Sequence, residues 1–185
     1  MRSNLHQAAT DRDWPLTPPA VSRAYAELKS LRILVINDDD GVRQFLQLLL
    51  EGDGHIVLTT DRGARGLELA ALRPDLIICD MKMPGLDGFA VVRAIRQNAC
   101  TRDIPFIFLT GSVDTDERQR GVTLGADDCV GMPFKKADLN TAITAACHKH
   151  DLMKLRLRIS AGLGQPEPSA PLALFDQEAP RLAAG

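Results

Sequence analysis

Apolar and polar positions follow a regular order along the central part of the chain. Short, continuous apolar runs are separated by longer segments in which apolar residues recur at every third or fourth position. The runs predict buried strands at 32–37, 55–60, 75–79, 105–110 and 127–130. The longer segments predict amphipathic helices at 41–52, 63–72, 87–98, 114–124 and 136–150. Strands and helices that alternate in this way form a parallel sheet covered on both faces, so the pattern predicts an α/β fold.

The helix that begins near Gly41 has the clearest pattern. Its apolar residues have the spacing i, i+3, i+4, i+7 and i+8, and they are Val42, Phe45, Leu46, Leu49 and Leu50. This spacing predicts a buried stripe. The helical pattern weakens after His150. Residues 155–159 alternate with period two, so both a longer last helix and a short extra strand are open there.

The two ends of the chain differ from the central part. Residues 1–30 form an N-terminal extension, with a turn-rich stretch at 14–19 and a short helix predicted over Ala20–Ser30. This extension either docks loosely or makes a partner contact centred on Trp14 and Tyr25. Residues 151–185 form a C-terminal extension, and its proline-rich part, 161–185, is predicted to be disordered. Leu172, Leu174 and Phe175 in that part are a candidate docking motif.

Composition excludes several classes of protein. The 185 residues suffice for one domain with tails, and 22 basic against 24 acidic side chains offer no general attraction to nucleic acid. The start of the chain lacks a signal peptide, and no apolar run is long enough to span a membrane. The scattered cysteines, Cys79, Cys100, Cys129 and Cys147, favour a reduced cytoplasmic protein. Enzyme signatures such as a phosphate-binding loop are missing, so we do not expect an enzyme.

Polar residues end three of the apolar runs. The first run leads into Asn37-Asp38-Asp39-Asp40, the third into Asp80, and the fourth into Thr110. Ligands of open α/β sheets bind at the carboxyl ends of the strands, where these side chains would meet. Carboxylates and a hydroxyl at one edge suit a hard cation and a phosphoryl group.

The order of these motifs resembles the receiver domain of bacterial two-component response regulators, the CheY-like superfamily. The motifs are the acidic cluster after the first strand, D-x-x-M-P-G-x-D-G from Asp80, L-T-G at Thr110 and G-A-D-D…P-F around the last strand. Thr110 and Met132 lie thirty and fifty-two positions after Asp80, as in the family. The resemblance covers residues 31–150. It implies a doubly wound (βα)5 flavodoxin-like parallel sheet with strand order 2-1-3-4-5.

The resemblance also implies a chemistry. Asp80 would accept a phosphoryl group from a sensor histidine kinase or a phosphotransfer protein. Mg²⁺ would be held by Asp38, Asp80 and the backbone carbonyl of Lys82, and the Thr110 hydroxyl would bind the phosphoryl group and start the switch.

Three positions depart from the family's pattern. Asn37 replaces an acid, Met132 replaces the lysine before the Pro-Phe pair, and Cys129 replaces an aromatic ring that relays the signal. A register slip of one residue would instead make Asp38 and Asp39 the acidic pair. Without the lysine and one acid, the pocket keeps the formal charge of −2 of the usual set, so magnesium binding is still expected.

The departures leave two functions open. The first is a stand-alone receiver that is phosphorylated on Asp80 and signals through protein contacts. The second is a pseudo-receiver that binds its partner independently of phosphorylation. In the first case the side chain of Lys82, two residues after Asp80, would partly replace the missing ammonium group; otherwise it is a solvated loop lysine.

A homodimer is also expected through the face formed by helix 114–124, strand 127–130 and helix 136–150. This face carries charged residues of both signs, which suit symmetric pairing of two copies. They are Asp116, Arg118, Arg120, Asp127 and Asp128. His148 and His150 are expected to be exposed histidines at the end of the last helix, near the negative pole of its dipole.

Overall fold

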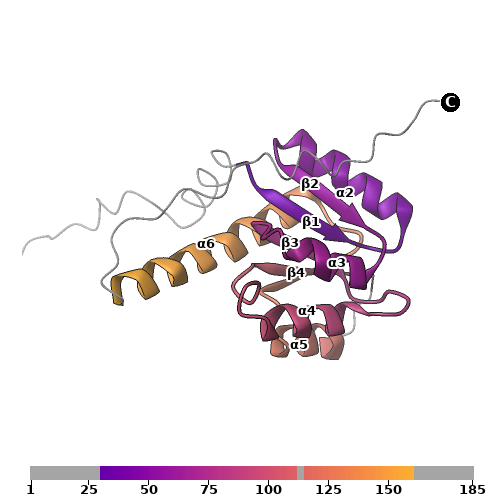
Figure 1. Cartoon of the computed structure of the whole chain (residues 1–185). Helices are drawn as coiled ribbons and strands as arrows, with labels where there is room; N and C mark the ends of the chain where they lie inside the picture. The colour runs from indigo at the N-terminus through magenta and orange to yellow at the C-terminus, as the bar shows by residue number, and fades with distance from the viewer. Residues whose placement is uncertain (1–29, 112–114, 161–185) are drawn as a thin grey trace, which may run out of the picture.

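The computed structural model describes residues 30–160 except 112–114 (Figure 1). Several predictions concern residues outside these ranges. They are the partner contact at Trp14 and Tyr25, the helix over 20–30 apart from Ser30, and the disorder and docking motif after residue 160.

A parallel five-stranded sheet forms the centre of the described structure (Figure 1). Its strands are β1 (Arg32–Ile36), β2 (Ile56–Thr60), β3 (Leu76–Asp80), β4 (Phe106–Thr110) and β5 (Asp128–Gly131). The strand order is β2-β1-β3-β4-β5, and all four neighbouring pairs are parallel. The predicted flavodoxin-like fold and strand order are therefore confirmed.

Five helices cover both faces of this sheet. They are α2 (Asp40–Gly52), α3 (Gly63–Ala70), α4 (Gly88–Gln97), α5 (Thr115–Thr123) and α6 (Lys136–Ser160). Alternate residues of β1 point to opposite faces, as the pleat requires. Leu34 and Ile36 pack in the core on the side of α3 and α4. Ile33 and Val35 pack in the core on the side of α2 and α6. Two apolar cores therefore fix the sheet between helical layers.

The buried stripe of α2 is narrower than the sequence predicts. Leu46 and Leu50 are fully buried, whereas the Phe45 side chain is 53% exposed. Phe45 lies at the margin of the stripe, and its ring packs against that of Phe134, a partly buried residue at the edge of the core, with ring centroids 6.1 Å apart. The prediction that Phe45 is buried is wrong.

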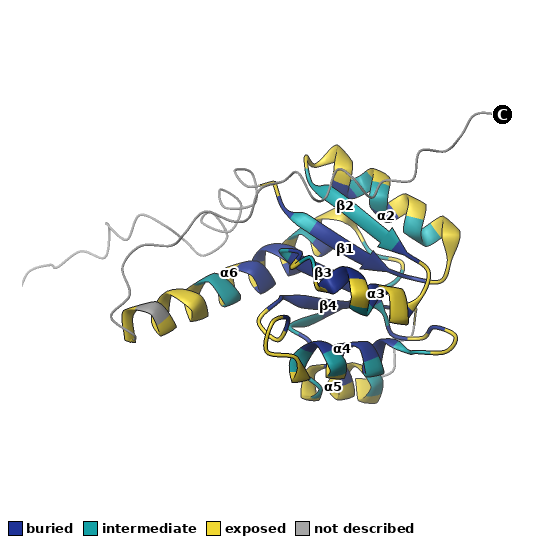
Figure 2. Ribbon diagram, viewed as in Figure 1, coloured by how far each residue is buried: buried dark blue, intermediate teal, exposed yellow. Residues whose placement is uncertain are grey.

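The last helix does not end at residue 150, because α6 continues to Ser160. The segment Leu155–Ile159 is helical, so of the two interpretations left open the helix extension is correct. Leucine, lysine and arginine are good helix formers, and five alternating residues are too short a pattern to outweigh that preference. The extension projects beyond the sheet and is largely exposed (Figure 2). None of the described helices is both long and apolar enough to cross a membrane.

Candidate functional site

The carboxyl ends of β1, β3 and β4 lie side by side at one edge of the sheet. In the strand register Ile36 pairs with Cys79, and Asp80 pairs with Leu109. Asn37 and Asp38 directly follow β1, while Asp80 and Thr110 are the last residues of their strands. The polar residues singled out in the sequence therefore come from adjacent strands and share this edge.

Asp80 is a half-buried carboxylate with a raised pKa. Burial is the main cause, and the negative charge of Asp38 adds to it. The backbone amide of Lys82 donates to Oδ1 of Asp80 at 3.3 Å and opposes the rise. The surroundings of Asp80 disfavour its ionised form. A cation bound beside the carboxylate would therefore stabilise that form.

Some side chains of the acidic loop after β1 make hydrogen bonds within the fold, and others are exposed to solvent. Asn37 is 1% exposed, and its Oδ1 accepts a hydrogen bond from the Asp39 amide at 2.8 Å. Asp39 caps α2, since its Oδ1 accepts from the Val42 amide at 2.9 Å. Asp38 is exposed, and its charge acts on Asp80. Asp38 is thus the available carboxylate of the loop, while Asp39 serves the helix.

Two glycines explain the shape of the loop after Asp80. Gly85 has a φ of +77°, a backbone conformation that residues other than glycine rarely adopt. A Cβ at Gly88 would lie 2.1 Å from the backbone oxygen of Asp80. Asp87 then caps α4, with its Oδ1 accepting from the Ala90 amide at 2.7 Å. The M-P-G-x-D-G motif therefore brings the start of α4 directly against the backbone of Asp80.

Lys82 connects this loop to α5. Its side chain is 67% exposed, and its Nζ lies 2.8 Å from Oε1 of Glu117. The positive charge of Lys82 also lowers the pKa of Asp80, against the stronger effect of burial. Lys82 is therefore both ion-paired to α5 and electrostatically coupled to Asp80.

The remaining positions of the pattern lie on β4 and β5. Thr110 is 2% exposed, and its carbonyl oxygen accepts a hydrogen bond from the Met132 amide at 2.7 Å. Met132 thus adjoins the site through its backbone, but its thioether brings no charge. Cys129 is buried, and burial raises the pKa of its thiol to about 11. Arg118 of α5 donates a hydrogen bond to the carbonyl oxygen of Cys129 at 2.9 Å, which links α5 to β5 at this position.

The oxygen donors at this edge fit a hard cation. In the part of the chain that the structure describes, no group of three or more histidine, cysteine or acidic residues is placed to hold a metal ion. The site offers two carboxylates, Asp38 and Asp80, and the charge of Asp38 adds to the raised pKa of Asp80. Mg²⁺ keeps several waters and needs only one or two carboxylates with a carbonyl oxygen. The residues present therefore fit Mg²⁺.

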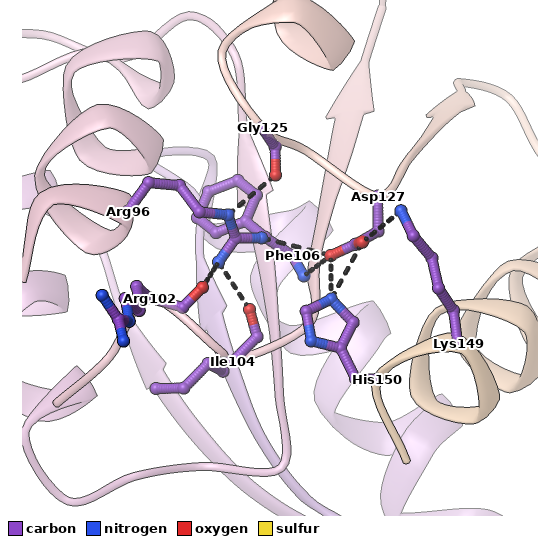
Figure 3. Close-up of polar contacts among 8 residues, drawn as sticks. All are labelled: Arg96, Arg102, Ile104, Phe106, Gly125, Asp127, Lys149 and His150. Atoms are coloured by element: carbon purple, nitrogen blue, oxygen red, sulfur yellow. Dashed lines mark hydrogen bonds and ion pairs between the residues drawn. The ribbon is translucent and has the colours of Figure 1, made fainter. Parts of the chain in front are cut away.

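A second cluster of charges lies at the opposite, amino edge of the sheet, around Asp127 (Figure 3). Its side chain is 4% exposed, and it accepts hydrogen bonds from Arg96 at 3.1 Å and from the Phe106 amide at 2.9 Å. Lys149 and His150 of α6 bind the same carboxylate at 3.0 and 2.9 Å. Burial alone would raise the pKa of Asp127, but the bonds from His150, the Phe106 amide and Lys149 outweigh it and lower the pKa.

This cluster corrects two expectations from the sequence. Asp127 is not an exposed charge of a dimer surface, because it joins α4, β4 and α6 in the interior. His150 is not an exposed residue at a helix end, since its side chain is 11% exposed and α6 continues for ten residues. The partners of Asp127 lie 21 to 31 residues away in the chain, and no local pattern marks them.

Comparison with known proteins gives a consistent result. The family model for the response regulator receiver domain matches residues 33–144. The transcriptional regulatory protein AfsQ1 of Streptomyces coelicolor is 41% identical over 118 residues, 63% of this chain and 51% of that protein. The DNA-binding response regulator MtrA of Mycobacterium tuberculosis is 33% identical over 65% of this chain and 52% of that protein. The chain spans about half the length of these curated relatives.

Solved structures agree with the sequence relatives. A response regulator receiver domain protein from Clostridium thermocellum has a TM-score of 0.61 and 34% identity, over 66% of this chain and 98% of that one. The receiver domain of a sensor histidine kinase from Pseudomonas aeruginosa has a TM-score of 0.60 and 26% identity, over 65% of this chain and 99% of that one. That structure is described with a magnesium ion coordinated in its active site cleft.

Proposed function

The chain belongs to the response regulator receiver domain family, and on that premise we propose that it accepts a phosphoryl group on Asp80. The donor would be a histidine of a sensor kinase or of a phosphotransfer protein. One observation carries the proposal: Asp80 is a half-buried carboxylate at the carboxyl edge of the sheet, with a pKa raised by burial and by the charge of Asp38. A basic, partly desolvated carboxylate is a good nucleophile.

The chain's own residues would divide the work of the transfer. An oxygen of Asp80 attacks the phosphorus, and the bond from phosphorus to the partner's histidine nitrogen breaks. Asp38, Asp80 and the carbonyl of Lys82 would hold Mg²⁺, which neutralises charge on the phosphoryl oxygens. The Thr110 hydroxyl at the end of β4 would donate to a phosphoryl oxygen. Gly88 keeps the backbone of Asp80 in place against α4.

Lys82 is the available substitute for the ammonium group that Met132 lacks. The lysine side of its ion pair with Glu117 is exposed, but the Glu117 side chain is only 25% exposed, so Lys82 would leave a partly buried partner. A charge-assisted bond to a phosphoryl oxygen would offset that cost. We assign Lys82 this part in the transfer.

The alternative function is a pseudo-receiver whose contacts do not depend on phosphorylation. Cys129 favours it, because this buried thiol has no ring that could move between two positions. In either case we propose that the output is contact with another protein in the cytoplasm rather than turnover of a substrate or binding of nucleic acid. The homodimer that the sequence predicts through α5, β5 and α6 stays a prediction and an alternative pairing, with Asp116, Arg118, Arg120 and Asp128 as its charged residues.

Phosphorylation can be tested with the full chain, Mg²⁺ and acetyl phosphate, with intact-mass spectrometry as the readout. We expect one phosphoryl adduct that requires Mg²⁺ and is lost in Asp80→Asn. Asp39→Asn is the matched control, because asparagine caps a helix as well as aspartate does and the adduct should persist. Lys82→Ala should slow labelling or shorten the adduct's lifetime. Wild-type protein that never forms the adduct would refute the phosphoacceptor and leave the pseudo-receiver.

A further inference from the structure

The outer face of α6 carries an exposed seam with coiled-coil spacing. Its six residues are separated by 4, 3, 4, 3 and 4 positions, and all are exposed. They are Thr141, Ala145, His148, Leu152, Leu155 and Ile159. Residues spaced in this way lie along one side of a helix. The buried residues of α6, such as Leu139, Ile143 and Ala146, lie on the other side against the sheet. The seam therefore faces directly away from the body of the domain.

Exposed apolar surface is concentrated on the projecting part of this helix. Among the described residues eight large apolar side chains are exposed, and five of them lie between Leu152 and Ile159. On the seam itself the exposed fractions are 46% for Leu152, 51% for Leu155 and 70% for Ile159. Exposed apolar side chains gathered on one projecting helix mark a candidate interaction site.

We propose that two copies of this chain pair in parallel along this seam. The charges beside it support a second copy as the occupant. When Leu152 and Leu155 take the a and d positions of a heptad, Asp151 takes the g position and Arg156 the e position of the following heptad. In a parallel pair these positions face each other across the two helices. Asp151 of each copy then faces Arg156 of the other, and the twofold axis gives two such pairs.

The rest of the helix is compatible with this pairing. Because the seam points away from the sheet, the two domains lie on opposite sides of the paired helices and do not collide. Thr141 and Ala145 are small, so the helices can approach closely beside the bodies, while Leu152, Leu155 and Ile159 supply apolar contact at the tip. The ion pair of Asp127 with Lys149 and its hydrogen bond with His150 hold the helix to the body just before the apolar part begins.

The first test is the mass of the full chain in solution, measured by light scattering or sedimentation over a range of concentrations. We expect twice the mass of one chain, without any phosphoryl donor and equally for Asp80→Asn. Leu155→Glu should return the protein to one chain. Leu157→Glu is the matched control, since Leu157 is 67% exposed but lies about 200° around the helix from Leu155. It should leave the dimer intact.

Cross-linking tests the direction of the pair. With the exposed Cys100 changed to serine, Leu155→Cys should form an intermolecular disulfide on mild oxidation, because parallel pairing brings the two copies of position 155 within disulfide reach. Leu157→Cys should not. Arg156→Glu should weaken the dimer at least tenfold, and Asp151→Lys combined with Arg156→Glu should restore it.

Two results would overturn the inference. A wild-type chain that stays a monomer and gives no cross-link at position 155 would mean that residues 1–29 or 161–185 of the same chain cover the seam, or that it stays open. A dimer that survives Leu155→Glu would place the contact on another surface, such as the face of α5, β5 and α6. Neither result depends on phosphorylation of Asp80, so the inference and the proposed function fail separately.

Discussion

Asp80 and Asp127 lie at opposite edges of the same sheet, and their pKa values shift in opposite directions. Burial disfavours the charged form of both side chains. Asp127 is surrounded by Arg96, Lys149, His150 and a backbone amide. Asp80 has the backbone amides of Lys82 and Met81 and the charge of the Lys82 side chain, against the neighbouring carboxylate of Asp38. A buried aspartate with its partners inside the fold maintains the structure, whereas one without them is available to a ligand.

Of the substitutions that separate the two aspartates, removal of the Asp127 carboxylate should change the free energy of unfolding most. Asp127→Ala removes the acidic partner of Arg96 and His150 in a nearly dry site, so the free energy of unfolding should fall by about 3 kcal/mol. Urea denaturation measures it. Asp103→Ala, at an exposed ion pair with Arg102, should cost less than about 0.5 kcal/mol. Equal losses at the two positions would contradict the structural role of Asp127.

Gly88→Ala tests the geometry of the other edge without changing a charge. Its Cβ would lie 2.1 Å from the Asp80 carbonyl oxygen and 2.9 Å from the Phe108 ring, so the backbone of β3 or α4 must move. We expect a loss of about 2 kcal/mol in unfolding free energy and slower labelling of Asp80. Gly52→Ala, which meets nothing within 4 Å at the end of α2, is the control and should not destabilise.

Asp80→Asn should have a small effect on stability and in the opposite direction from Asp127→Ala. Because the ionised carboxylate is disfavoured in the fold, its replacement by a neutral amide should raise the unfolding free energy at pH 7 by roughly 0.5 kcal/mol. A loss of stability comparable to that of Asp127→Ala would show that Asp80 is satisfied within the fold.

The pH dependence of stability should separate the two aspartates further. The folded pKa of Asp127 lies below 3.8, so its contribution is complete above 3.8 and is lost as the pH falls through the folded value. The folded pKa of Asp80 lies above 3.8, so its neutral form favours folding below 3.8, and that contribution is lost as the pH rises through the folded value. Denaturation of wild type, Asp127→Asn and Asp80→Asn from pH 2.5 to 7 measures both.

Asp38→Asn should produce the smallest change. With the neighbouring charge removed, the pKa of Asp80 should fall towards its ordinary value while burial keeps it raised. Carboxyl carbon NMR titration of Asp80 measures this shift. Asp39→Asn serves as the control, since Asp39 is engaged at the start of α2. An unchanged pKa in Asp38→Asn would mean that burial alone determines it.

The carboxyl edge was predictable from sequence, because its residues follow directly after apolar strands. The sequence predicted the strand order and the positions of Asp38, Asp80 and Thr110 at strand ends. It also identified the positions filled by Asn37, Met132 and Cys129. What local sequence could not predict was how Asn37 and Lys82 are engaged, with Asp39 and with Glu117, since these contacts depend on side-chain geometry.

The amino edge was not predictable by the same reasoning. Asp127 and its partners Arg96, Lys149 and His150 are ordinary charged residues on separate elements, and only the fold brings them together. The length of α6 was left open because its exposed last turns lack the buried stripe of a packed helix.

The junction between Asp127 and α6 also has a mechanical consequence. Ten residues of unbroken helix follow His150, a rod about 15 Å long whose base is held by two side chains to the sheet. A rod fixed at its base cannot swivel independently, so its tip turns whenever the domain turns. A partner bound to that tip would therefore turn with the whole domain, although it lies far from the carboxyl edge of the sheet that carries Asp80.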